Sequence, residues 1–187
     1  MVYVLMLRRT LLSASMAWWI AGCQSPPEPP PEPPTQSVCH DALGVCLALP
    51  AAWLPQGDGA ALLYAGPAST DAFYTVISLQ GVVDDGAPLE AALDLMFAPL
   101  ASDRRLVWQR QEPRVVSGRP ALHYDVAFDL EDSPRRRVGL LLAGSGVVVD
   151  LAYSAVPRLF WSGLPAFDTA VETLSVAPPE APGSRGW

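Results

Sequence analysis

Residues 121–153 read ALHYDVAFDLEDSPRRRVGLLLAGSGVVVDLAY, and this stretch decides the fold class. From Ala121 to Asp129 apolar and polar side chains alternate, which is the two-residue period of a strand with one buried face. The alternation predicts that four side chains face the core: Leu122, Tyr124, Val126 and Phe128. It predicts that three others face outward: His123, Asp125 and Asp129.

Turn sequences recur on both sides of this strand. Ser117-Gly118 precedes it, and Asp132-Ser133-Pro134 and Gly144-Ser145-Gly146 follow it. These turns predict consecutive strands at residues 106–116, 121–129, 136–143 and 147–153. Because tight turns connect them, neighbouring strands must be antiparallel.

Two segments carry the helical period instead. In residues 88–100 one apolar stripe follows spacings of three and four: Leu89, Ala92, Leu93, Met96, Phe97 and Leu100. In residues 157–174 a second stripe does the same: Phe160, Leu164, Phe167, Val171 and Leu174. Pro165 interrupts the second stripe, so we expect a short turn followed by a helix there.

Three shorter strands are predicted before the first helix, at residues 45–49, 60–65 and 72–80. Strands that are grouped together, with only two main helices, indicate an α+β fold. We therefore predict an antiparallel β-sheet with two main helices packed on it.

This order of elements resembles the Mog1/PsbP-like fold. The resemblance rests on Pro50 and Trp53 at the entry, on Tyr153-Ser154-Ala155-Val156-Pro157 followed by Phe160, and on Leu174-Ser175-Val176 at the end. It spans about residues 38–176, which we take as the domain. The resemblance implies a non-enzymatic role, and it carries no binding residue over to this chain, because this scaffold serves unrelated functions.

The first residues have the parts of an export signal. Arg8 and Arg9 supply positive charge, and an apolar stretch follows at residues 11–21. Ile20-Ala21-Gly22-Cys23 resembles the lipobox of bacterial lipoproteins, which implies a signal peptide at residues 1–22 and a diacylglycerol on the Cys23 thiol. Two alternatives remain: an ordinary secretory peptide, and a spanning helix, for which the stretch is shorter than the roughly 20 residues required.

A proline-rich tether follows the lipidated cysteine, and together they cover residues 23–37. Residues 26–34 contain seven prolines and two glutamates, a composition that favours an extended polyproline II spacer. The alternative is a ligand for a proline-binding module. Residues 177–187 are again rich in proline and glycine, and we expect a flexible tail.

Cys39 and Cys46 remain as an even pair in an exported domain, which favours a disulfide. Residues 41–44 between them predict a turn, so the two cysteines would face each other across a hairpin. The alternative is a metal site made by Cys39, His40 and Cys46, which lacks a fourth ligand nearby.

Catalytic sets are not recognisable in the sequence. Gly144-Ser145-Gly146 is not a nucleophile elbow, because Ala143 stands where the first glycine of that motif belongs. His123 and Asp125 form the one arrangement that suggests a base, and an exposed polar strand face explains it equally well. We therefore predict no enzyme activity, no catalytic residue, no cofactor and no metal.

Arg135, Arg136 and Arg137 are the one concentration of charge, and they suggest a docking site for an acidic partner. Local pairing with Glu131 and Asp132 is the alternative. Trp161 lies off the apolar stripe of its helix and is a second candidate for partner binding, because Trp and Arg dominate interface hot spots. The sequence predicts core or edge packing for two other tryptophans, Trp53 and Trp108.

The chain carries a formal net charge of −7, which argues against nucleic acid as a partner. We expect a membrane-anchored envelope lipoprotein that binds another envelope protein, with its domain in the periplasm or at the cell surface. Gln24 after the cysteine favours the outer membrane in a host with two membranes. The alternative function is a carrier or sensor of a small apolar or lipid ligand, and an unrecognised hydrolase is a third.

Overall fold

The computed structural model describes residues 33–56, 61–67, 75–83, 86–130, 133–143 and 147–177. The predicted signal peptide, Cys23 and residues 24–32 of the proline-rich tether lie outside these residues, whereas residues 35–37, which were predicted to belong to the tether, lie in the first strand. So do the tail after Ala177, the acidic pair Glu131 and Asp132, and the turn at residues 144–146.

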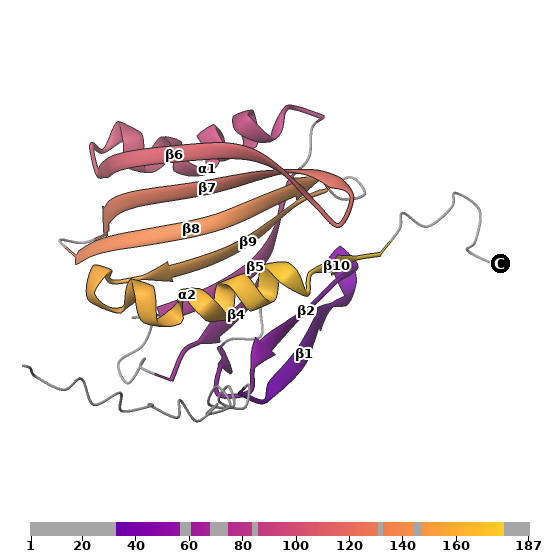
Figure 1. Cartoon of the computed structure of the whole chain (residues 1–187). Coiled ribbons are helices and arrows are strands. Elements are labelled where there is room, and N and C mark those ends of the chain that lie inside the picture. The colour runs from indigo at the N-terminus through magenta and orange to yellow at the C-terminus, as the bar shows by residue number, and fades with distance from the viewer. Residues whose placement is uncertain are drawn as a thin grey trace, which may run out of the picture. The chain divides into compact units, whose positions relative to one another are not determined.

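The strands of the described domain form two antiparallel sheets (Figure 1). The larger sheet has the order β3-β4-β5-β9-β8-β7-β6. Its strands are β3 (Leu54–Gln56), β4 (Leu62–Ala65), β5 (Thr75–Val83), β6 (Leu106–Val116), β7 (Arg119–Leu130), β8 (Ser133–Ala143) and β9 (Val147–Ala155). The smaller sheet has the order β1-β2-β10, with strands β1 (Thr35–His40), β2 (Val45–Pro50) and β10 (Ser175–Val176). The predicted meander of residues 106–153 is confirmed as strands β6 to β9.

Two helices cover opposite faces of the larger sheet (Figure 1). Helix α1 (Leu89–Ser102) packs its buried Leu93 and Phe97 against one face. Helix α2 (Pro157–Glu172) and the smaller sheet pack against the other face. The prediction that His123 and Asp125 point to open solvent is therefore wrong: α2 covers much of their face, and both are half-buried.

Helix α2 runs without interruption through Pro165, so the predicted short turn is also wrong. A proline inside a helix removes the hydrogen bond to the carbonyl four residues earlier, here that of Trp161. Pro165 and Trp161 both lie on the exposed side of α2, so the lost hydrogen bond is not in the packed core. The buried side of the same turns, with Phe160 and Phe167, keeps the helix packed on the sheet.

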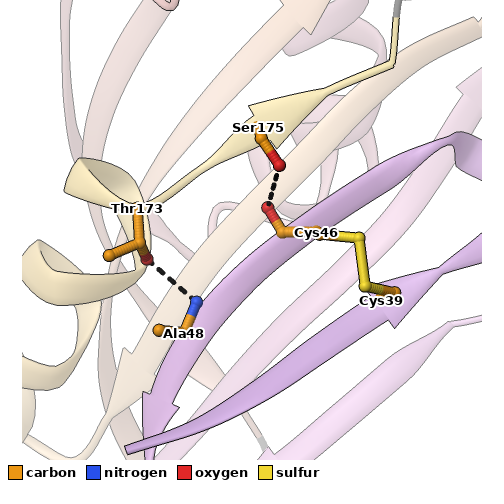
Figure 2. Close-up of a disulfide and its surroundings, with 5 residues drawn as sticks. All are labelled: Cys39, Cys46, Ala48, Thr173 and Ser175. Atoms are coloured by element: carbon orange, nitrogen blue, oxygen red, sulfur yellow. Dashed lines mark hydrogen bonds between the residues drawn. A yellow bond between two sulfur atoms is a disulfide. The ribbon is translucent and has the colours of Figure 1, made fainter.

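Cys39 and Cys46 form a disulfide and lie directly opposite each other on β1 and β2 (Figure 2). The bond confirms the predicted hairpin and occupies both sulfurs, which removes them as thiolate metal ligands. Gly44 closes the turn with a positive φ of 61°, a conformation that glycine adopts at little cost. The residues after α2 fasten this hairpin, because the Ala48 amide donates to Thr173 Oγ1 at 2.9 Å and the Ser175 hydroxyl donates to the Cys46 carbonyl at 3.3 Å.

The centre of the sheet contains a tyrosine that lies flat over a glycine. Tyr124 on β7 is directly opposite Gly139 on β8. A β-carbon on Gly139 would overlap the Tyr124 ring, so the ring occupies the space that a side chain there would fill. Tyr124 is fully buried and packs edge-on against Phe97 of α1, with ring centroids 5.6 Å apart. Glycine is therefore required at position 139 for packing rather than for backbone freedom.

We expect Gly139→Ala to lower the free energy of unfolding by about 2–3 kcal/mol, because the buried Tyr124 ring has no space into which it can move. Urea denaturation monitored by circular dichroism measures this loss. In a Tyr124→Val background the same substitution should cost less than about 0.5 kcal/mol, because the clashing ring is gone. An equal cost in both backgrounds would show that the contact does not explain the glycine.

Candidate functional site

The three consecutive arginines do not form one patch, because successive side chains of a strand point to opposite faces. Arg136 of β8 lies on the α2 face, where it contacts Phe160. Arg137 lies on the α1 face, where it donates to Tyr124. Arg135 has the same strand parity as Arg137. The prediction of a single three-arginine docking site is therefore wrong.

Arg137 belongs to a buried polar network. It donates from Nε to the Tyr124 hydroxyl at 2.9 Å and from Nη2 to Asp150 Oδ2 at 2.5 Å. Asp150 is fully buried and also accepts from the Tyr124 hydroxyl at 2.7 Å and from Gln80 Nε2 at 2.9 Å. Removing one partner of such a pair typically costs about 3–5 kcal/mol, because the other charge stays buried. The network thus ties β5, β7, β8 and β9 together and has a structural role.

Burial raises the pKa of Tyr124 well above its ordinary value, and the charge of Asp150 adds to the effect, while Arg137 opposes it. The hydroxyl therefore stays protonated and keeps donating to Asp150. This part of the α1 face accordingly supplies packing and register, and the candidate binding residues lie on the opposite face.

Arg136 is surrounded by aromatic rings and one carboxylate. Its guanidinium lies 4.3 Å from the ring centroid of Phe160, 4.9 Å from that of Trp161 and 5.5 Å from that of Trp108. Its Nε and Nη2 donate to the two carboxylate oxygens of Asp125 at 3.1 and 2.7 Å. A bidentate ion pair combined with cation–π contacts fixes both the position and the plane of the guanidinium. These five residues are called here the Arg136 cluster.

The strand register builds this cluster. Trp108 lies opposite Ala127, Ala127 lies opposite Arg136, and Arg136 lies opposite Ala155, so one row crosses four strands. The small Ala127 leaves room for the guanidinium and the Trp108 indole above it. Helix α2 begins immediately after this row and brings Phe160 and Trp161 over the end of it.

The cluster presents two tryptophans to solvent. Trp161 is 66% exposed and Trp108 is 40% exposed, whereas Phe160 beneath them is buried. The structure thus brings together two of the predicted partner-binding residues, Arg136 and Trp161. Sequence reasoning missed Trp108 and Asp125 as members of the cluster. The strand parity of Asp125 and Arg136 was readable, but the register of the hairpin that joins β7 and β8 was not. Trp108 does lie on the edge strand β6, as predicted, and Trp53 is buried as predicted.

His123 lies at the other end of the same face and is not joined to Asp125. It borders a cavity of about 420 Å³ between β6, β7 and α2, together with Arg114, Asp168 and Glu172. The carboxylate of Asp125 binds Arg136 instead. The His123 and Asp125 pair that suggested a base is therefore not assembled in the described part of the chain.

Burial lowers the pKa of His123 below its ordinary value, and nearby Arg114 lowers it further, against the opposing charges of Asp125 and Glu112. The unfolded chain binds a proton near the ordinary pKa of about 6.5, while the folded chain binds it only at lower pH. The unfolded state therefore carries more protons between these two values, and the free energy of unfolding falls as the pH drops through this window.

We expect this loss of stability to be smaller in a His123→Asn variant. Urea denaturation of both proteins at pH 7.5 and pH 5.5 measures the difference, and the contributions of carboxylates shared by both proteins cancel. Equal losses in the two proteins would contradict the lowered pKa.

No protein-family model matches the sequence, and no curated protein matches it significantly. Solved structures do match. The cyanobacterial PsbP (CyanoP) of Synechocystis sp. PCC 6803 has a TM-score of 0.56 and 12% identity, with 80% of this chain and 96% of that chain covered. The protein of unknown function PA94 from Pseudomonas aeruginosa has a TM-score of 0.54 and 17% identity, with coverages of 77% and 98%.

A third match is LpqN of Mycobacterium tuberculosis, described as involved in cell envelope biogenesis. It has a TM-score of 0.52 and 17% identity, with 78% of this chain and 91% of that chain covered. At these identities the matches show the fold, which is PsbP-like, as the sequence resemblance implied. Among the described residues no helix has the length and apolar character needed to cross a membrane.

Proposed function

We propose that this protein is a lipid-anchored accessory protein of the cell envelope that binds another protein through the Arg136 cluster. One observation carries the proposal: an arginine locked in place between two solvent-exposed tryptophans. Tryptophan and arginine are the residues most enriched at interface hot spots.

The rigidity of the cluster favours binding. Ordering a flexible arginine at an interface costs about 0.5–1.5 kcal/mol in side-chain entropy. In Arg136 that ordering already exists in the free domain, because Asp125 and the rings hold the side chain. A partner therefore meets a preformed surface.

The chemistry of the cluster defines the kind of partner. The Trp161 and Trp108 side chains would fit an apolar recess on the partner surface. Within the described chain Arg136 uses Nε and Nη2 for Asp125, and Nη1 makes no hydrogen bond. A carbonyl or carboxylate oxygen on the partner is the matching acceptor for Nη1. We infer an apolar protein surface with an acceptor group at its rim.

The amino-acid sequence and the similarity to a solved structure both support a location in the cell envelope. The apolar leader and the Ile20-Ala21-Gly22-Cys23 motif support lipidation of Cys23 after export. The disulfide between Cys39 and Cys46 fits an oxidising compartment. The structural neighbour LpqN, described as acting in cell envelope biogenesis, supports the same location.

We expect Trp161→Ala to weaken partner binding by about tenfold or more, because it removes the largest exposed anchor of the cluster. A photo-crosslinking amino acid at Arg110, which is exposed on β6 with the same strand parity as Trp108, would trap the partner in intact cells of the native host. Mass spectrometry identifies the product, and its yield is compared with and without Trp161→Ala.

Leu95→Ala is the matched control. Leu95 is a 70% exposed apolar residue on α1, the helix that covers the opposite face of the sheet. It should leave the crosslinked product unchanged. A product that is insensitive to Trp161→Ala, or equally sensitive to both substitutions, would overturn the Arg136 cluster as the binding site.

The lipid anchor has its own test. Cells fed labelled palmitate should incorporate the label into the wild-type protein, which should fractionate with membranes. A Cys23→Ser variant should carry no label and appear in the soluble fraction, because several acyl chains are required for durable anchoring. Wild-type protein in the soluble fraction would refute lipidation.

A further inference from the structure

A cavity of about 280 Å³ lies between the end of β2, the start of β5 and the middle of α2. Its lining is largely apolar, with two hydroxyl side chains: Pro50, Trp53, Pro67, Thr75, Ser162, Gly163, Pro165 and Ala166. None of these side chains is charged, so the cavity offers nothing to compensate a charged ligand.

One polar group in this lining has no partner. Thr75 is only 2% exposed, and its Oγ1 makes no hydrogen bond to any described residue. The other hydroxyl in the lining, that of Ser162, donates to the Leu159 carbonyl at 2.8 Å. Buried polar side-chain atoms are nearly always hydrogen-bonded, so an orphaned one at a cavity wall indicates a missing partner.

Gly66 packs tightly against both Thr75 and Trp53. Gly66 follows β4, and its amide donates to the Thr75 carbonyl at 3.0 Å. A β-carbon on Gly66 would come within 2.6 Å of Thr75 Oγ1 and 3.1 Å of the Trp53 ring. Glycine at this position therefore lets the hydroxyl and the indole share one wall.

The Trp53 side chain cannot rotate into the cavity and fill it. It is 4% exposed, and it packs edge-on against Tyr153, with ring centroids 6.2 Å apart. The Tyr153 hydroxyl in turn donates to the Phe160 carbonyl of α2 at 3.0 Å, over Gly163. Trp53 and helix α2, which border the cavity, are thus held in place by their contacts with Tyr153.

We propose that this cavity binds a small neutral molecule that contains one ring and one hydrogen-bonding group, with that group paired to Thr75 Oγ1. The volume fits, because an apolar cavity of about 150 Å³ already accepts benzene. The tryptophan and prolines supply flat apolar surface for the ring, and the threonine supplies the single polar contact. This site is independent of the proposed partner binding and goes beyond it.

The probes are benzyl alcohol and toluene, which differ by one hydroxyl, with benzoate as the charged comparison. Titrations of the exported chain are followed by two-dimensional NMR at the Trp53 indole N–H and the amides of Gly163 and Ala166. We expect saturable shifts at these positions with benzyl alcohol, weaker binding of toluene by about fivefold, and no binding of benzoate.

Thr75→Val keeps the side-chain volume and removes the hydroxyl, so it should abolish the preference for benzyl alcohol over toluene. Thr75→Ser keeps the hydroxyl and should retain the preference, which separates loss of the hydrogen bond from damage to the fold. Leu95→Ala should leave both affinities unchanged, because Leu95 lies on α1, which covers the opposite face of the sheet.

Three outcomes would overturn the proposal. Absence of saturable shifts in the wild type would mean that the cavity holds only water. An unchanged preference in Thr75→Val would mean that the hydroxyl does not contact the ligand. Equal binding of benzoate and benzyl alcohol would mean that the cavity does not select a neutral ligand.

Discussion

The contact of Tyr124 with Gly139 and Asp150 is the constraint on which the rest of the domain depends. A sheet with both faces covered must satisfy any polar group in its centre. Asp150 is such a group, and Tyr124 reaches its carboxylate at 2.7 Å only by lying over a residue without a side chain. Arg137 then supplies the opposite charge. Four strands are joined in one register by this arrangement.

The register has consequences on the other face. A slip of one residue would move every side chain of a strand to the opposite face. With the register held, Arg136 emerges on the α2 face opposite Ala127, and Asp125 lies close enough to bind it with both oxygens. The buried network therefore places the residues of the Arg136 cluster without being part of it.

Helix α2 connects the two candidate sites. Its first turns carry Phe160 and Trp161 to the Arg136 cluster, and the next residues, from Ser162 to Ala166, line the cavity with Trp53. The helix is positioned by Tyr153, whose ring fits against Gly163 and whose hydroxyl binds the Phe160 carbonyl. At its end, Thr173 and Ser175 join it to the disulfide hairpin (Figure 2). Side chains of both sites thus lie on one helix, and the contacts of Tyr153, Thr173 and Ser175 fix the position of that helix.

The sequence by itself determined the secondary structure of the meander, the first helix, the cysteine pair and the α+β class. These features depend on the local hydrophobic periodicity, on turn-forming residues and on short separations along the chain. All three can be read from neighbouring residues. It also identified Arg136 and Trp161 as candidates. Only the tertiary structure decided that α2 continues through Pro165, that His123 and Asp125 are partly covered, and that Arg136 and Arg137 lie on opposite faces in different roles. The physical reason is that burial and cross-strand register arise from residues far apart in the chain, so Trp108, Asp125, Arg136 and Trp161 become neighbours only when the sheet and its second helix are assembled.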